Sequence, residues 1–329
     1  MNWRAVRHED LEECLSITPA AMGHELLGKD RALAAWRSLI GNESFNSAVI
    51  ESDHRIAGHR IVGFGASLFV SAPFAIEEAS EPKPGLNARI MASIACNRSV
   101  VLTNDELRYQ NTVGGLHLVF LCAASKRHLL RAEQAAEVEA VLAMACLQGH
   151  QGYRLCQALR EATDSFDIEQ IRSQRVFGTI TAFDSCKHAT NPPNIWNRDR
   201  ALGVSTRADA LAVPGSVTAI LFSYHEPILR LQDEQQRLLS AALRGMTDEE
   251  LSQALGLKLP AIKKRWASVF RHFAEGCPEL MPELEQDLDR KKRGPQKRHH
   301  LLAYVREHPE ELRPALRASA HRTNGGKGL

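Results

Sequence analysis

The chain contains no apolar stretch that could cross a membrane. None of its 329 residues belongs to a run near the ~20 consecutive apolar residues that a transmembrane helix requires. The N-terminal segment MNWRAVRHEDLEE also lacks the apolar centre of a secretion signal. These two absences predict a cytoplasmic protein without a membrane partner.

Motifs for metal binding and for common catalytic chemistry are missing as well. The seven cysteines, an odd number, show neither paired metal-ligand spacing nor a disulfide framework. No histidine pair has the H-E-x-x-H spacing, and neither a G-x-S-x-G motif nor a Walker-type phosphate loop occurs. Because these motifs are absent, we predict no metal, no cofactor and no catalytic residue.

Positive charge is concentrated at one end of the chain. The formal net charge is only +2, yet from Arg290 to Leu329 eleven Lys and Arg stand against three Glu. The tail therefore carries +8 and the remaining residues carry −6. A basic tail of this kind favours a polyanionic partner, because each neutralised phosphate releases counterions. DNA, RNA and an acidic membrane all fit the tail alone.

Short amphipathic helices are predicted before this tail, within 231–273. The first spans about 233–243 and ends at Gly245, a residue that accommodates a left-handed helix cap. The second begins at Thr247, whose hydroxyl and the Glu250 carboxylate form the reciprocal hydrogen bonds of a capping box.

The third predicted helix is unusually basic. It follows a turn at Gly256, starts near Pro260, and carries Lys263, Lys264 and Arg265 on its outward face. A helix, a tight turn and a second helix form the arrangement in which the second helix enters the DNA major groove. The alternative is that the three charges are a solvated helix face.

The order of residues in 231–273 resembles the LuxR-type helix-turn-helix of transcriptional regulators. The similarity covers about 45 residues, and Lys258 and Ala261 depart from it by replacing the hydroxyl residues common at those positions. The resemblance implies an all-α DNA-binding domain and a homodimer, since paired units read two half-sites. The candidate DNA-binding residues are Lys258, Ala261, Lys263, Lys264, Arg265, Arg271, Arg290, Lys291, Lys292 and Arg293.

The N-terminal part alternates predicted strands and helices, which indicates an α/β or α+β domain. The expected strands are 3–6, 48–51 and 60–70, and the expected helices are 10–17 and 30–40. The segments RAVRHEDLEECLSI and VIESDHRIAGHRIVGFGASLFV resemble the opening strand, first helices and central hairpin of GCN5-related N-acetyltransferases. That resemblance implies an acetyltransferase-like fold over about 1–150.

The acetyl-CoA loop of that family, Q/R-x-x-G-x-G/A, is not recognisable. Such a loop holds a pyrophosphate on backbone amides at a helix N-terminus. The nearest stretch, QGHQGY at 148–153, has a different glycine spacing, although it precedes a predicted helix at 153–162. We therefore expect a degenerate acetyl-CoA pocket or a purely structural use of the fold, and favour a non-enzyme.

Further elements are predicted downstream of the hairpin. They are a buried strand at 114–124, an Ala-rich helix at 132–146, and strands at 175–183 and 215–224. A long loop at 184–203 separates the last two, and loops of this length are often functional. Trp196, Arg198 and Arg200 could line a ligand pocket there, or Trp196 could simply anchor the loop on the core.

Together these patterns predict a one-component, DNA-binding transcriptional regulator. Its expected domains are an α/β sensor or dimerisation domain at 1–228, a LuxR-like helix-turn-helix at 229–280, and a basic extension with one helix at 281–329. The expected partners are double-stranded DNA, a second copy of the chain, and an unidentified small-molecule or protein effector. The alternative is an acetyltransferase-like enzyme whose C-terminal module docks on a nucleic acid or protein, and a pure protein-interaction module is a third possibility.

Overall fold

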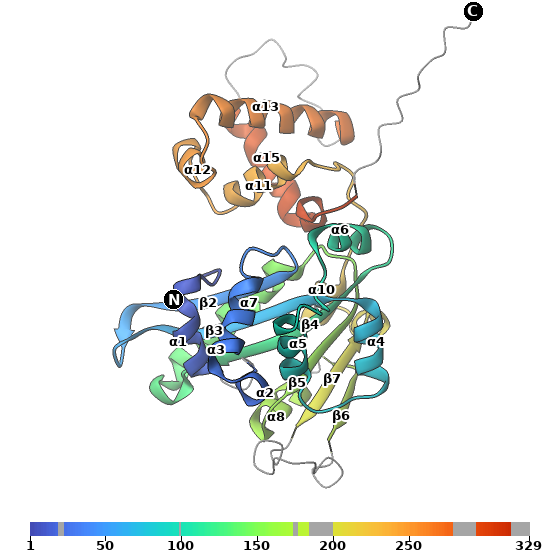
Figure 1. Cartoon of the computed structure of the whole chain (residues 1–329). Coiled ribbons are helices and arrows are strands. Elements are labelled where there is room, and N and C mark those ends of the chain that lie inside the picture. Colours follow the sequence, from blue (N-terminus) through green and yellow to red (C-terminus); the bar gives the residue numbers. More distant parts are fainter. Residues whose placement is uncertain (19–22, 99, 174–176, 184–199, 279–293, 317–329) are drawn as a thin grey trace, which may run out of the picture. The chain divides into compact units, whose positions relative to one another are not determined.

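The chain folds into two compact units, Met1–His225 and Glu226–Leu329. The computed structural model, whose elements are labelled in Figure 1, describes residues 1–18, 23–98, 100–173, 177–183, 200–278 and 294–316. Within these ranges no helix combines the length and the apolar character needed to span a bilayer.

The larger unit is built around one mixed sheet of seven strands, in the order β1-β2-β3-β4-β5-β7-β6. The strands are β1 Asn2–Arg4, β2 Phe45–Ile56, β3 His59–Val70, β4 Leu116–Ser125, β5 Leu155–Ala162, β6 Thr179–Ala182 and β7 Ala201–Thr206. β4 and β5 are parallel, and the other neighbouring pairs are antiparallel. The sheet confirms the predicted α/β unit and the predicted β2–β3 hairpin.

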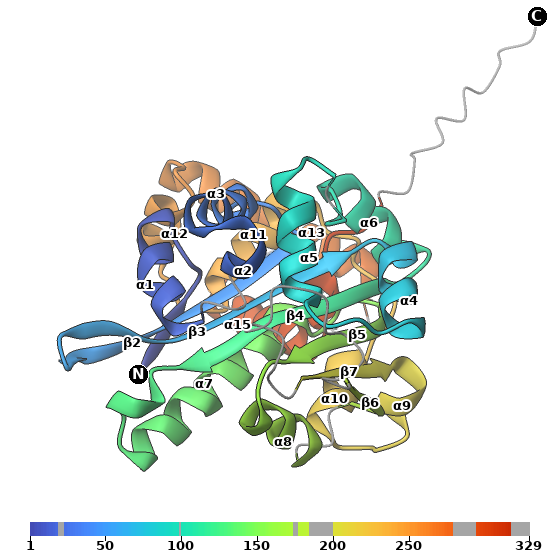
Figure 2. The same cartoon turned by 60° about the horizontal axis from the view of Figure 1, so that its bottom comes forward.

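Helices cover both faces of this sheet. They are α1 Leu11–Ile17, α2 His24–Leu27, α3 Lys29–Leu39, α4 Ala72–Ser80, α5 Leu86–Ala95, α6 Asn104–Thr112, α7 Ala132–His150, α8 Ser165–Ser173, α9 Arg207–Leu211 and α10 Val217–Phe222, with the short 3-10 turns η1 His8–Asp10 and η3 Arg127–Leu129. In Figure 2, α1, α3 and α5 lie above the sheet and α7 and α8 lie below it.

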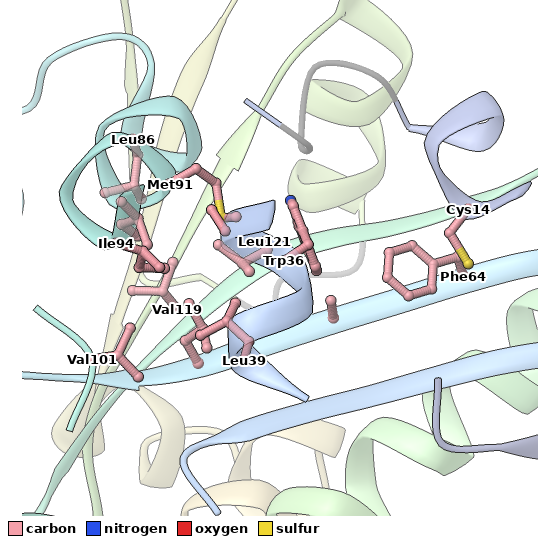
Figure 3. Packing of buried hydrophobic residues seen from close by; sticks show 14 of the residues in the cluster. Cys14, Trp36, Leu39, Phe64, Leu86, Met91, Ile94, Val101, Val119 and Leu121 are labelled. Atoms are coloured by element: carbon pink, nitrogen blue, oxygen red, sulfur yellow. The ribbon is translucent and has the colours of Figure 1, made fainter. Parts of the chain in front are cut away.

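The largest apolar core lies between the sheet and helices α1, α3 and α5. Trp36 of α3 and Phe64 of β3 are fully buried, with their ring centroids 5.8 Å apart. Met91 of α5 and Leu121 of β4 belong to the same cluster (Figure 3). Because burying each such side chain contributes roughly 1.5–3 kcal/mol, this core fixes α3 and α5 over β3 and β4.

Helix α7 approaches the opposite face of the sheet closely because β3 carries glycines there. A Cβ atom at Gly63 would lie 2.7 Å from Cγ1 of Val138, and one at Gly65 would lie 3.2 Å from Cδ2 of Leu142. Both apolar side chains of α7 pack in one buried cluster with Ile50 of β2. The absence of side chains at the two glycines therefore sets the distance between helix and sheet.

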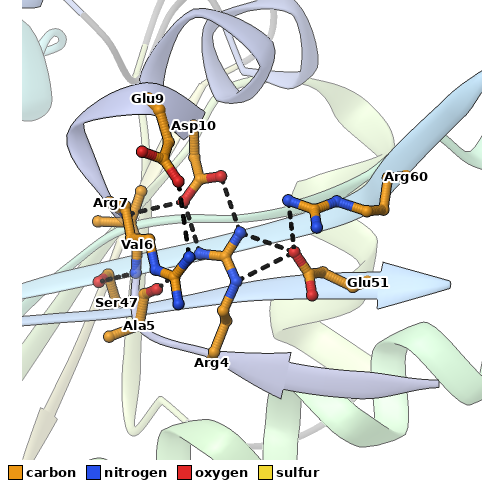
Figure 4. A network of polar contacts seen from close by, with 9 residues as sticks. All are labelled: Arg4, Ala5, Val6, Arg7, Glu9, Asp10, Ser47, Glu51 and Arg60. Carbon is orange, nitrogen blue, oxygen red and sulfur yellow. Dashed lines mark hydrogen bonds and ion pairs between the residues drawn. The ribbon is translucent and has the colours of Figure 1, made fainter. Parts of the chain in front are cut away.

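An ion-pair network attaches the first strand to the rest of the sheet (Figure 4). Arg4 donates to Asp10 at 2.6 and 2.8 Å and to Glu51 at 2.7 and 3.0 Å, and Arg60 also pairs with Glu51 at 3.1 Å. Burial alone would raise the pKa of Asp10, but hydrogen bonds from Arg4 and the Arg7 amide outweigh it and lower that pKa. The carboxylate therefore stays ionised at neutral pH.

Two elements predicted from the sequence are wrong, and the last residues of the predicted loop at 184–203 belong to strand β7. Residues 153–162, predicted to be helical, form strand β5, because pairing with β4 and β7 decides their conformation. Residues 215–224, predicted to be a strand, contain helix α10, whose N-cap Ser216 accepts a hydrogen bond from the Ala219 amide at 3.0 Å. Periodicity alone does not separate a strand from a helix in apolar runs this short.

The smaller unit is helical in all the elements that the structure describes. They are α11 Asp233–Ala242, α12 Asp248–Ala254, α13 Leu259–Gly276, α15 Gly294–Glu307 and the 3-10 turn η5 Pro309–Leu312. The predicted capping box is confirmed, since Thr247 Oγ1 accepts from the Glu250 amide at 3.3 Å and Glu250 accepts from the Thr247 amide at 2.7 Å. Gly245 and Gly256 adopt positive φ values of 82° and 63° at the two turns. These local features do not by themselves establish a helix-turn-helix that reads DNA.

A buried carboxylate joins the start and the end of the smaller unit. Glu311 accepts hydrogen bonds from the amides of Ile228 and Leu229 at 2.8 and 3.0 Å and from the Tyr304 hydroxyl at 3.2 Å. Burial raises the pKa of Glu311, against the lowering effect of these hydrogen bonds. Its stabilising contribution is therefore complete below the unfolded pKa, near 4.5, and is lost as pH rises through the higher folded pKa.

The free energy of unfolding of this unit should fall less with rising pH above 4.5 in Glu311→Gln than in the wild type, because the amide does not ionise. Thermal melts at several pH values between about 4 and 7 would measure this dependence. Glu307→Gln, at an exposed position of α15, is the matched control and should keep the wild-type dependence. If the melting temperatures of Glu311→Gln and the wild type changed with pH in the same way, Glu311 would not be the source of this pH dependence.

Candidate functional site

Strands β4 and β5 stop pairing before either strand ends. Their register runs from Leu116 opposite Leu155 to Phe120 opposite Arg160. Beyond that point β4 is paired with β3 alone and β5 with β7 alone, among the strands that the structure describes. From Cys122 to Ser125 the edge of β4 that faces β5 takes part in no strand pairing among the described residues. We call this opening the strand gap.

A β-bulge lies at the start of the strand gap. The register of β3 with β4 steps from Ser67 opposite Phe120 to Ala66 opposite Cys122, so Leu121 has no partner in β3. Asn87 of α5 donates through Nδ2 to the Leu121 carbonyl at 2.7 Å. Bulges re-aim the backbone and are frequent beside active sites. Here the bulge is held in place by a side chain from a helix.

A buried ion pair lies on the β5 side of the strand gap. Oε1 of Glu161 accepts from the Gly85 amide at 2.6 Å and from Arg200 at 3.3 Å. Gly85 directly precedes α5, so the carboxylate lies at the positive end of that helix. Arg200 was predicted as a pocket residue and lies buried here, whereas Trp196 and Arg198 fall outside the described residues.

A basic segment follows β4 and leads to the N-terminus of α7. Its basic residues are Lys126, Arg127, His128 and Arg131. Lys126 is buried, and its Nζ lies 2.8 Å from both Glu13 Oε1 and His59 Nδ1. Arg127 and Arg131 are exposed. A helix N-terminus with flanking cations is suited to anionic groups, including phosphate.

The stretch 148–153, weighed from the sequence as the acetyl-CoA loop, lies at the other end of α7. It contains the last turn of that helix, where the dipole is negative and disfavours phosphate. His150 is buried there, with Nδ1 2.7 Å from the Cys146 carbonyl and Nε2 2.7 Å from Ser67 Oγ. The sequence analysis did not single out the basic residues that precede this helix.

The thiol beside the bulge is not activated. Burial raises the pKa of Cys122 to about 12, so the group is a neutral thiol at pH 7. His117, nearer the start of β4, has its pKa lowered by burial, although its hydrogen bond to Gln157 acts in the opposite direction. Within the described ranges no group of three or more His, Cys, Asp or Glu is arranged to hold a metal ion.

The predicted DNA-binding residues all belong to the smaller unit. Lys258, Lys263, Lys264 and Arg271 are exposed along α13 or at its N-cap, while Ala261 and Arg265 are half-buried. Arg290, Lys291, Lys292 and Arg293 lie outside the described residues.

No family model matches the chain, and no curated protein matches it. Among solved structures it is similar to FeeM, an N-acyl amino acid synthase from uncultured soil microbes, at 12% identity and a TM-score of 0.32 over 64% of this chain and 95% of that one. It is also similar to the C-terminal condensation domain of Ebony in complex with beta-alanyl-dopamine, at 13% sequence identity and a TM-score of 0.35. That match covers 62% of this chain and 98% of the other. A mutant agmatine N-acetyltransferase in its apo form matches at 16% sequence identity and a TM-score of 0.32, over 62% of this chain and 98% of the other.

These findings correct the main functional prediction. The three matched structures are named for acyl transfer or condensation, and these findings contradict the predicted transcriptional regulator. They agree with the acetyltransferase-like resemblance of the N-terminal part and give no support to a LuxR-type domain. Because all three TM-scores are below 0.5, the roles of individual residues come from the geometry of this chain alone.

Proposed function

We propose that the chain is an acyltransferase that moves an acyl group from a coenzyme A thioester to an amine. The observation that carries this proposal is the strand gap, which opens between two parallel strands at a bulge. The pantetheine arm of coenzyme A is narrow and extended and contains two amides. Such an arm can hydrogen-bond to the unpaired edge of a strand in the way an added strand does. Cys122 to Ser125 of β4 provide that edge, directly after Leu121, whose carbonyl accepts from Asn87.

The basic segment supports the same placement of the cofactor. Arg127 and Arg131 flank the N-terminus of α7 directly after β4. The phosphates of coenzyme A would bind there, on the positive end of the helix and on both guanidinium groups. The thioester would then lie toward Leu121, at the start of the strand gap.

The reaction needs a polarised thioester carbonyl and a neutral amine. Backbone amides at a bulge can donate to the carbonyl oxygen as negative charge develops on it. The amine nitrogen then forms the new C–N bond, the C–S bond breaks, and the amine proton ends on the coenzyme A thiol. Because burial keeps Cys122 protonated, direct attack is favoured over an acyl-enzyme on that thiol.

The double variant Arg127→Ala, Arg131→Ala should weaken coenzyme A binding by about tenfold, because it removes two exposed cations from the phosphate site. Affinity for pantetheine, which has no nucleotide, should stay unchanged. Isothermal titration of both ligands measures the difference, and Arg37→Ala on the exposed face of α3 is the matched control. Equal affinities of the variant and the wild type would refute the phosphate site. Absence of any coenzyme A binding by the wild type would refute the acyltransferase proposal itself.

A further inference from the structure

Asn87 is a buried side chain with only one of its two polar atoms paired. It is 3% exposed, and Nδ2 donates to the Leu121 carbonyl at 2.7 Å. That contact fixes the orientation of the amide, since only the nitrogen can donate to a carbonyl. Oδ1 then has no hydrogen-bond partner in the part of the chain that the structure describes. A buried acceptor without a partner is uncommon in proteins and calls for an explanation.

The first turn of α5 bonds to both strands of the gap. The Gly85 amide donates to Glu161 of β5, and two residues later Asn87 donates to the bulge residue Leu121 of β4. Leu121 follows Phe120, the last residue of β4 that pairs with β5. The side chain of Asn87, with its unpaired oxygen, therefore bonds to β4 at the point where β4 and β5 cease to pair.

We propose that Asn87 is a positioning residue of the acyl-transfer site, whose Oδ1 accepts a hydrogen bond from an N–H group of a bound reactant. The inference rests on the proposed function. Both reactants carry such a donor, the pantetheine arm as an amide and the acceptor as an amine. Through Nδ2 the same side chain holds the bulge, so one amide group couples the shape of the strand to the placement of the reactant. Asn87 itself exchanges no proton or acyl group.

A double-mutant cycle that pairs a protein variant with a ligand analogue separates this role from a purely structural one. The first arm titrates S-ethyl-coenzyme A and its analogue in which an ester oxygen replaces the amide N–H nearest the sulfur. The wild type should prefer the N–H probe by about tenfold, and Asn87→Ala should abolish that preference. Asn87→Asp should retain it, because a carboxylate still accepts, although its contact with the Leu121 carbonyl becomes repulsive.

The second arm compares kcat/KM for primary amines and their N-methyl counterparts at saturating acetyl-coenzyme A. If the reactant bound by Oδ1 is the amine, Asn87→Ala should change this ratio and leave the probe preference of the first arm intact. Asn111→Ala is the matched control, because the buried Asn111 already uses Oδ1 to accept from the Arg154 amide at 2.9 Å. Thermal melts verify that each variant is folded.

The two proposals fail in different ways. Unchanged preferences in both arms for Asn87→Ala, or equal losses in Asn87→Ala and Asn87→Asp, would show that Asn87 only holds the bulge, and would overturn the inference. No binding of S-ethyl-coenzyme A to the wild type would overturn the proposed function and the inference with it. Tight binding without any dependence on Asn87 would leave the proposed function standing.

Discussion

Glu161→Ala is expected to destabilise the larger unit by about 3–5 kcal/mol, because it leaves a buried guanidinium without its carboxylate. The side chains of Glu161 and Arg200 are 1% and 5% exposed, so water cannot replace the lost contact. The Gly85 amide would lose its acceptor as well. Chemical denaturation of the variant and the wild type measures the difference.

Two comparisons make this result specific to the buried pair. Glu161→Gln should cost less, since the amide oxygen can still accept from the Gly85 amide. Glu169→Ala, at an exposed position of α8, should change stability by no more than about 0.5 kcal/mol. A loss below about 1 kcal/mol for Glu161→Ala would mean that the pair contributes little. The same variant also gives a prediction for ligand binding. The affinity for coenzyme A should be lower in Glu161→Ala than in the wild type, because Glu161 fixes the first turn of α5 beside the strand gap.

Trp266→Ala is expected to destabilise the smaller unit by about 3–5 kcal/mol, the usual cost of truncating a buried aromatic residue. The Trp266 ring stacks on Phe270 with centroids 5.6 Å apart, and Nε1 donates to Asp248 at 3.2 Å. The Arg298 guanidinium lies 4.5 Å from the ring centre and also pairs with Asp248 at 2.9 Å. The truncation therefore opens a cavity and breaks contacts among α12, α13 and α15.

Hydrogen exchange followed by peptide separates this effect from changes elsewhere in the chain. Peptides from α11 to α13 should exchange faster in Trp266→Ala, while peptides from β3 and β4 should keep wild-type protection. Lys263→Ala, at an exposed position of the same helix, is the control and should change stability by no more than about 0.5 kcal/mol. Unchanged exchange in α11 to α13 would contradict the central role of Trp266 in this core.

Surface charge alone does not identify the partner of the smaller unit. Lys263 and Lys264 are exposed on an amphipathic helix, as predicted, but an exposed basic face fits many partners. Arg298, part of the basic tail for which a polyanionic partner was expected, pairs with Asp248 and lies over the Trp266 ring. A run of basic residues in the sequence predicts an exposed helix face. It does not show which of those residues form ion pairs or ring contacts within the folded unit.

The candidate site could be predicted only in fragments. The buried strand β4 and the helix α7 were predicted from the sequence, whereas the basic residues between them, which form the proposed phosphate site, were not singled out. Asn87 was not predicted because it lies on α5, a helix that the sequence analysis did not identify, and because its hydrogen-bond partner among the described residues is a backbone carbonyl. No periodicity or motif reports which carbonyl a distant side chain will contact.

By itself the sequence determined the elements whose signals are local. The cap at Thr247, the turns at Gly245 and Gly256, the β2–β3 hairpin and the helix α7 follow from hydrogen bonds and side-chain periodicity within a few residues. The tertiary structure decided that 153–162 is a strand, that β4 and β5 cease to pair after Phe120, and that Asn87 and Glu161 attach α5 to both strands. Parallel pairing, a bulge and a buried ion pair join residues far apart in the chain, and their free energy exists only once the sheet and its helices have assembled.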